Sequence, residues 1–238
     1  MKASQRPVIL LTGDIVDDGK LNQYKRAVDI LSPLVEAKFK VMASPGNHDY
    51  GHYGIRYEEA AQDRFRKYIL ADLLNIPKAK KAGVTLPDLY PLKNTMGDVV
   101  FIGLDSVVGN KDEALQLASG EVGATQRELL AEMLQEIGSD KKVVVYFHHH
   151  PFYRNLFKRI ALELDDAKEV MTLLSGRANL VCFGHKHVSH CWPDDWQIDW
   201  ILASGKSTKR TKNYKFQFRE VLINGEDSEV NLVTFKRD

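Results

Sequence analysis

Short apolar runs, separated by longer polar or mixed segments, recur through the first three quarters of the chain. Each run is bounded by turn-forming or polar residues, which is typical of a buried strand rather than of a helix. The expected strands are residues 8–12, 40–43, 99–104, 143–147, 179–183 and 198–203.

Between these runs, apolar residues recur every three or four positions, which predicts amphipathic helices. One helix is expected from Leu21 to Val35, with Pro33 ending or kinking it. Thr125 and Glu128 have the spacing of a capping box at the start of a second helix, which stops at Gly138. A third helix is expected around residues 170–174.

The last quarter of the chain has a different pattern. Residues 216–223 and 230–235 flank Asn224-Gly225, a dipeptide that favours the tight turn of an antiparallel hairpin. No repeat, low-complexity tract or linker interrupts the sequence, so one α/β domain is expected over residues 1–238.

Composition narrows the class of protein. With 44% hydrophobic and 27% charged residues, the chain is typical of a globular protein. No apolar run approaches the ~20 residues of a membrane-spanning helix, and no signal-peptide core follows the first residues, so a cytoplasmic location is expected. A net charge of +1 disfavours nucleic acid as the main partner. Cys182 and Cys191 are expected to be free, buried thiols.

The eight histidines fall in three short windows. Imidazole is a common metal ligand and the usual acid or base near pH 7, so three clusters indicate one converging site rather than scattered core residues. The windows are His48 and His52, then His148, His149 and His150, then His185, His187 and His190.

Polar side chains follow the expected strands at the point where each strand ends. Asp14 follows residues 8–12, Asn47 and His48 follow residues 40–43, and histidines follow the two later strands. The carboxyl ends of such strands line one edge of a sheet, where side chains from different loops converge on a ligand. Carboxylate, amide and imidazole donors together predict a cation site with oxygen and nitrogen ligands.

Four blocks resemble the calcineurin-like metallophosphoesterases, in this order: Gly13 to Gly19, Gly46-Asn47-His48-Asp49, His149-His150-Pro151 and Gly184-His185-Lys186-His187. Within that family, Gly103-Leu104-Asp105-Ser106 and the run from His148 to Pro151 resemble the cyclic-nucleotide phosphodiesterase subgroup. The resemblance implies a two-sheet β-sandwich flanked by helices.

The resemblance also implies roles for individual residues. Asp14 would bridge two divalent metal ions, with Mn, Fe and Zn as the candidates. Asn47, His149 and His185 would complete one site, and His187 would belong to the other. His48 would face the substrate phosphate and protonate the leaving oxygen, with Asp49 orienting its ring.

Several assignments have alternatives. Within the triple histidine, the His-x-Pro pattern selects His149, which leaves His148 as a strand-end core residue and His150 as a loop residue. Asp17 and Asp18 either contact the site or belong to a turn. His52 and His190 are expected at the surface or beside the ligands. The cations in residues 206–215 form either a phosphate-attracting rim or a solvated loop.

The chain departs from the family pattern at its start. Family members begin with a strand carrying Asp-x-His, and no histidine precedes His48 here. The first strand of the family is therefore expected to be missing. Either the chain is shortened at its N-terminus, or the protein holds one ion well and another weakly.

The function expected from this sequence is metal-dependent hydrolysis of a small phosphodiester by a metal-bound hydroxide, with a cyclic nucleotide as one candidate substrate. The alternative is a binding or scaffold protein that keeps the fold but has lost turnover. Retention of His48, which a scaffold would not need, favours the enzyme.

Overall fold

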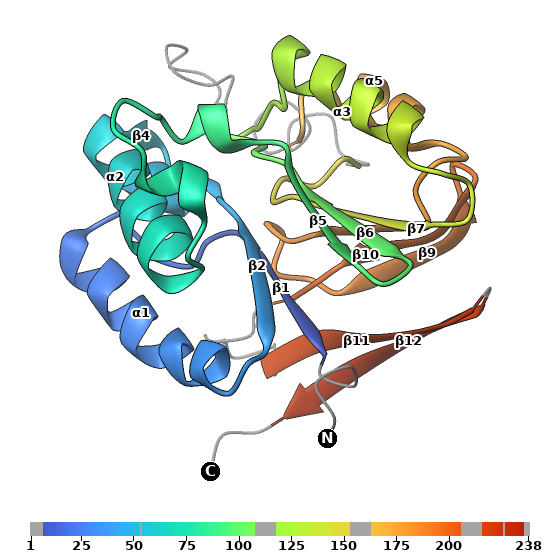
Figure 1. Ribbon diagram of the computed structural model, residues 1–238, viewed down its shortest axis with the longest axis horizontal. Helices are drawn as coiled ribbons and strands as arrows, with labels where there is room; N and C mark the ends of the chain where they lie inside the picture. Colours follow the sequence, from blue (N-terminus) through green and yellow to red (C-terminus); the bar gives the residue numbers. More distant parts are fainter. Residues whose placement is uncertain are drawn as a thin grey trace.

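In the described part of the chain, the largest sheet has six strands. The computed structural model describes residues 7–52, 54–107, 118–152, 163–205, 216–225 and 227–235. Its main sheet runs in the order β5-β6-β7-β8-β10-β9 (Figure 1). Strands β6, β7, β8 and β10 are parallel, and the edge strands β5 and β9 are antiparallel to their neighbours. The bounds are β5 Leu92–Met96, β6 Val99–Gly103, β7 Lys142–Tyr146, β8 Leu180–Phe183, β9 His190–Asp195 and β10 Ile198–Ala203.

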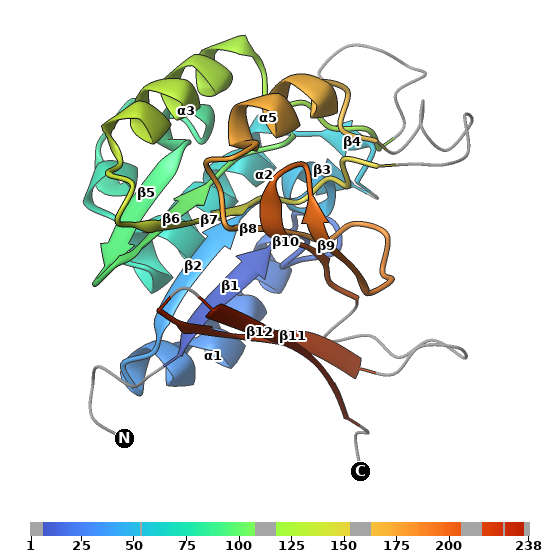
Figure 2. The same ribbon diagram turned by 90° about the vertical axis from the view of Figure 1, so that its right-hand side faces the viewer.

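A second β layer packs on one face of this sheet. Strands β1 (Val8–Thr12) and β2 (Lys40–Ser44) pair in parallel, and β11 (Phe216–Asn224) and β12 (Asp227–Phe235) form an antiparallel hairpin that lies beside them (Figure 2). Side chains from both pairs join one core cluster with the main sheet. The expected α/β class is confirmed, but within the described residues the second layer is two separate pairs rather than one sheet.

Helices cover the two outer faces. Helices α3 (Ala124–Glu136) and α5 (Ala167–Leu174) pack on the main sheet through a core that includes Leu130, Leu134 and Val170. On the opposite side, the core around β1 and β2 is completed by α1 (Leu21–Glu36) and the π-helix η3 (Phe65–Leu73), which directly follows α2 (Glu59–Arg64). Figure 2 shows these layers edge on. The shorter elements are η2 Asn47–Tyr50, β3 Gly51–His52, β4 Arg56–Tyr57, η4 Pro77–Lys80 and η5 Pro87–Leu89.

The alternation of side chains along β7 matters for the site. Val143, Val145 and Phe147 belong to the core beneath α3 and α5, whereas Val144 and Tyr146 belong to the core shared with β1 and β2. Successive side chains of a strand point to opposite faces, so His148 is the next residue directed toward β1 and β2. The same face carries the loop that follows β1.

The helix expected from Leu21 to Val35 is confirmed, but it does not end at Pro33. Helix α1 continues to Glu36, because Leu31 and Val35 pack against the core beside β1 and β2. The expected start of α3 was wrong. Thr125 is not the N-cap of α3, which Gly123 occupies. The Asp166 carboxylate, from the start of α5, accepts hydrogen bonds from the N–H groups of Val122 and Gly123 at 3.0 and 2.9 Å.

The expected strands at residues 8–12 and 198–203 are confirmed at both ends, and the expected hairpin forms around Asn224-Gly225. Strands β5 and β9 and the helical segment from Glu59 to Leu73 had no counterpart among the predicted elements. Cys182 and Cys191 are free and only partly buried, on strands that flank β10 from opposite sides. No helix in the described part of the chain is long and apolar enough to cross a membrane.

Candidate functional site

Four loops at the carboxyl ends of parallel strands bring the predicted polar residues together. Asp14 follows β1, Asn47 opens the turn η2 after β2, His148 follows β7, and His185 follows β8. These strands belong to two sheets, β1-β2 and the main sheet, and the loops at their carboxyl ends meet at one edge of the packed layers. Such an edge is where α/β proteins place their ligands, because loops from different strands meet there.

The centre of this cluster is the Nε2 atom of His148. It lies 3.1 Å from Asn47 Oδ1, 3.2 Å from Asp14 Oδ2 and 3.1 Å from His185 Nδ1. The other ring nitrogen, Nδ1, donates to the backbone carbonyl of Thr12 at 2.7 Å. The ring is therefore held in one orientation, with four side chains from four loops in mutual contact.

Within the triple histidine, the observed geometry differs from the arrangement expected from the His-x-Pro pattern. His148, expected in the core, occupies the centre of the cluster, and His149, expected there, lies to one side with Nδ1 2.9 Å from the Ser106 hydroxyl. The alternation along β7 explains the difference, because it directs His148 and not His149 toward the β1 loop. His150 packs against Phe183 and Trp192 with ring centroids 4.7 and 5.5 Å away.

Burial and mutual charge set the protonation of the central residues. Burial acts to raise the pKa of Asp14, but the neighbouring imidazoles, His148 first, outweigh it and hold that pKa well below its usual value. Burial acts to lower the pKa of His148, and the Asp14 carboxylate raises it above the usual value. Asp14 and His148 therefore form a charged pair. Burial, with the charge of His148, lowers the pKa of His185 to about 3.

Backbone conformation at the site is unusual. Asp14, His185 and His187 have φ values of 55°, 69° and 57°, in the left-handed region that non-glycine residues rarely adopt. At Gly46 the reason for glycine is close approach, because a Cβ atom there would lie 2.3 Å from Asp14 Oδ1. Strained residues of this kind cluster where side chains must be aimed at a ligand.

The Asp49 carboxylate binds the backbone of two loops. Its fully buried carboxylate accepts hydrogen bonds from the N–H groups of Ile15, Val16 and Gly46 at 3.2, 3.0 and 2.9 Å. Burial and the nearby Asp14 charge raise its pKa to about 7, against the lowering effect of those hydrogen bonds. Asp49 thus joins the β1 loop to the β2 loop through backbone N–H groups, and its expected role in orienting the His48 ring stays a prediction.

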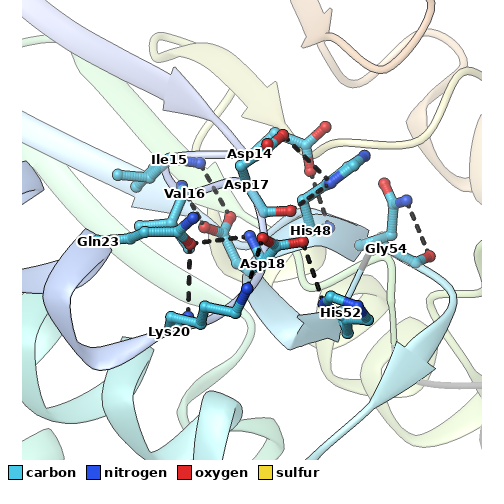
Figure 3. Close-up of polar contacts among 12 residues, drawn as sticks. Asp14, Ile15, Val16, Asp17, Asp18, Lys20, Gln23, His48, His52 and Gly54 are labelled. Atoms are coloured by element: carbon cyan, nitrogen blue, oxygen red, sulfur yellow. Dashed lines mark hydrogen bonds and ion pairs between the residues drawn. The ribbon is translucent and has the colours of Figure 1, made fainter.

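The His48 ring is held by the β1 loop instead. Its Nδ1 lies 2.7 Å from the Asp17 carbonyl oxygen, and its backbone N–H donates to Asp14 Oδ1 at 3.1 Å (Figure 3). A carbonyl only accepts, so Nδ1 carries a hydrogen. The Asp17 carboxylate is 3.8 Å from the same nitrogen. With 29% of its side chain exposed, His48 lies at the open side of the cluster.

The remaining candidates lie around this centre. His187 is exposed on the β8 loop, and its charge contributes to the low pKa of His185. His52 pairs with Asp18 at 3.3 Å, and Asp18 also contacts Lys20 at 3.1 Å (Figure 3). His190 is exposed and packs on Trp192, as a surface residue would. The cationic run at residues 206–215 lies outside the described residues.

The donor set suits a divalent cation. Asp14 offers a carboxylate, Asn47 an amide oxygen, and His148 and His185 two imidazoles, the mixture that Mn, Fe and Zn accept. His149 Nε2 and His185 Nε2 are buried without hydrogen-bond partners. His, Cys, Asp and Glu side chains alone form no group of three or more that could hold a metal in the described part of the chain. A cation there would need Asn47 and would replace the hydrogen on His148 Nε2.

Sequence reasoning missed Ser106 and the Thr12 carbonyl, which hold His149 and His148. The Thr12 contact leaves no sequence signal, because a backbone carbonyl is present at every position. Ser106 carried a signal, since it follows an apolar strand in the same way as Asp14 and Asn47.

Comparison with protein-family models identifies the family of the chain. Residues 2–189 match the family model described as calcineurin-like phosphoesterase. The chain belongs to this family. Membership makes it a metallophosphoesterase, a phosphoric ester hydrolase, and the family typically binds two metal ions. No curated protein sequence matches the chain significantly.

Solved structures show the same fold. A dimetal phosphatase from Danio rerio is 15% identical, with a TM-score of 0.63 over 96% of this chain and 84% of that one. A candidate 5'-nucleotidase from Staphylococcus aureus, solved with alpha-ketoglutarate, is 16% identical, with a TM-score of 0.53 over 96% of this chain. The match covers 45% of that longer protein. At these identities the likeness concerns the fold alone.

Proposed function

We propose that this metallophosphoesterase hydrolyses a phosphodiester and that Asp14, Asn47, His148 and His185 hold one divalent cation. The observation that carries the proposal is the meeting of Asp14, Asn47 and His185 at His148 Nε2, within 3.2 Å in each case. A divalent cation bound there supplies positive charge for a phosphoryl oxygen and activates water for attack. We assign a second, weaker cation to Asp14 and the exposed His187.

His48 is the proposed acid. Its Nδ1–H group donates a hydrogen bond to the Asp17 carbonyl oxygen, so Nε2 is the ring nitrogen available to contact the substrate. A protonated Nε2 donates to the leaving-group oxygen as the ester bond breaks. The backbone bond from His48 to Asp14 keeps this ring beside the cation ligands.

Phosphodiesters are proposed over monoesters on the sequence resemblance alone, and cyclic nucleotides belong in the substrate panel for the same reason. The test measures hydrolysis of bis-p-nitrophenyl phosphate, p-nitrophenyl phosphate and cyclic AMP with added Mn²⁺, together with bound metal by mass spectrometry. Diester hydrolysis that depends on Mn²⁺ is expected. Metal binding without hydrolysis of any ester would favour a scaffold, and monoester hydrolysis alone would overturn the proposed specificity.

The choice between the two histidines has its own test. His148→Ala is expected to lose the tightly bound cation, because it removes the donor at the centre of the cluster. His149→Gln is expected to retain the cation, because the His149 ring contacts Ser106 instead. The opposite result would return the ligand role to His149.

A further inference from the structure

Two adjacent polar residues, Asp105 and Ser106, lie fully buried beneath the site. They follow β6, and neither is among the candidate cation ligands. Buried polar side chains are costly unless hydrogen bonded, so what they bind indicates why they are there. Their partners lie on two of the loops that carry site residues.

Ser106 binds the end of β7. Its Oγ accepts hydrogen bonds from the backbone N–H groups of His148 and His149 at 3.2 and 3.1 Å. These two donors occupy both lone pairs of the hydroxyl, so its own hydrogen is directed to His149 Nδ1, 2.9 Å away. One hydroxyl therefore determines where the chain leaves β7 and which way the His149 ring faces.

The hydrogen bond from Ser106 also determines the tautomer of His149. Nδ1 accepts, so a neutral His149 carries its hydrogen on Nε2. This ring packs against His148 and His185 with centroids 5.1 and 4.7 Å away.

Asp105 binds the turn that carries Asn47 and His48. Tyr50, the last residue of that turn, donates its hydroxyl to Asp105 Oδ2, and the Val107 N–H donates to Oδ1 at 2.9 Å. The Gln126 side chain on α3 bonds both the N–H and the carbonyl of Asp105, each at 2.8 Å. Asp105 is thus itself held from two sides.

We propose that Asp105 and Ser106 are positioning residues of the phosphoesterase site, holding the Asn47 turn and the His148 strand end at the separation that cation binding requires. They act through Tyr50 and through the backbone of His148. The proposal rests on the proposed function, because its main readout is the affinity of the cation site. It predicts that a hydroxyl remote from the substrate controls that affinity.

The first experiment compares two buried serines. Ser106→Ala is expected to weaken Mn²⁺ binding, measured by titration calorimetry, by about 10–100-fold, as is usual when a group that orients ligands is removed. Ser44→Ala is the control, because Ser44 is equally buried and close to Asn47 in sequence, yet its hydroxyl has no hydrogen-bond partner. Affinity lost equally in both variants, or in neither, would overturn the proposal.

The second experiment needs no metal and separates this proposal from the proposed function. Amide hydrogen exchange in the metal-free protein is expected to accelerate at His148 and His149 in Ser106→Ala and to stay unchanged in Ser44→Ala. Ser106→Thr keeps the hydroxyl and is expected to restore slow exchange; if this variant does not fold, the alanine pair still decides. A wild-type protein that binds no Mn²⁺ would defeat the proposed function, whereas unchanged exchange in Ser106→Ala would defeat the positioning role.

The third experiment tests the Asp105 side with two buried tyrosines. Tyr50→Phe removes the hydroxyl that donates to Asp105 Oδ2 and is expected to weaken Mn²⁺ binding several-fold. Tyr90→Phe is the control, because the Tyr90 hydroxyl also makes one buried hydrogen bond, to the Ala43 carbonyl at 2.9 Å, within β2 rather than in the turn. Equal affinities in Tyr50→Phe and the wild type would remove Asp105 from the proposal.

Discussion

The two sides of the site are held in different ways. On the buried side, Asn47, Asp49 and His148 are at most 2% exposed, and their polar atoms contact one another or the backbone of another loop. On the open side, His48 and His52 are 29% and 37% exposed, and they face carboxylates or carbonyls of a single loop, residues 13–20.

This difference indicates what each side contributes. A buried hydrogen bond or ion pair that loses one partner leaves the other unsatisfied, so changes on the buried side are expected to affect folding and cation binding together. When an exposed side chain loses its partner, water replaces the lost contact and little stability is lost. Changes on the open side are therefore expected to affect the reaction and to leave the fold intact.

The largest effect is expected for Asp14→Ala. It removes a proposed cation ligand and the anionic partner of the buried His148, so hydrolysis should fall to background and bound metal should be lost. Breaking a buried pair typically costs about 3–5 kcal/mol, so the free energy of unfolding should also drop. Metal content, activity and urea unfolding measure the three changes. Lost activity with full metal content would show that Asp14 acts in the reaction, like the residues of the open side, and does not hold the cation.

His48→Ala should give the next largest effect, and on activity alone. Removal of a general acid typically lowers the rate by about 10²–10⁴-fold. Because the His48 ring is partly exposed and contacts a carbonyl, the melting temperature and the bound Mn²⁺ should stay close to those of the wild type. Loss of metal in this variant would show that His48 is a ligand rather than the acid.

Asp49→Asn tests whether Asp49 supports the fold or orients His48. The carboxylate accepts three backbone N–H groups with two oxygens, whereas an amide has only one oxygen to offer. Leaving a buried donor unpaired costs about 1–3 kcal/mol, which urea unfolding would detect. A large loss of rate at unchanged stability would instead support direct orientation of His48.

The smallest effect is expected for Asp17→Ala. The Asp17 side chain is 74% exposed, and the carbonyl that binds His48 remains in the variant. Exposed ion pairs contribute about 0–1 kcal/mol, equivalent to no more than about a five-fold change in rate. Steady-state kinetics would check this, with Lys20→Ala as a control on the same loop. A drop beyond tenfold would show that the carboxylate, not the carbonyl, holds the ring.

Much of the architecture could be read from the sequence. The apolar runs predicted β1 and β10 to the residue, and Asn224-Gly225 predicted the hairpin turn. The same pattern placed Asp14, Asn47 and His185 at the carboxyl ends of strands. These features depend on neighbouring residues alone, because side-chain period and turn preference act over a few positions.

Other features were decided by partners far along the chain. The two residues before α3, Val122 and Gly123, are held by the Asp166 carboxylate, more than 40 residues away, and Thr125 is not the N-cap of the helix. Asp49 binds the β1 loop, and His148 reaches Thr12 across 136 positions. No local pattern contains such contacts, because they depend on which loops the folded layers bring together.

The sequence by itself determined the chemistry of the site: its carboxylate, amide and imidazole donors, and the strand ends from which they project. Only the tertiary structure decided which of three consecutive histidines stands at the centre. Each of the three carries the same ring, so composition cannot separate them. The choice follows from the face of β7 on which each lies, and from the Thr12 carbonyl and Ser106 hydroxyl that hold His148 and His149 in place.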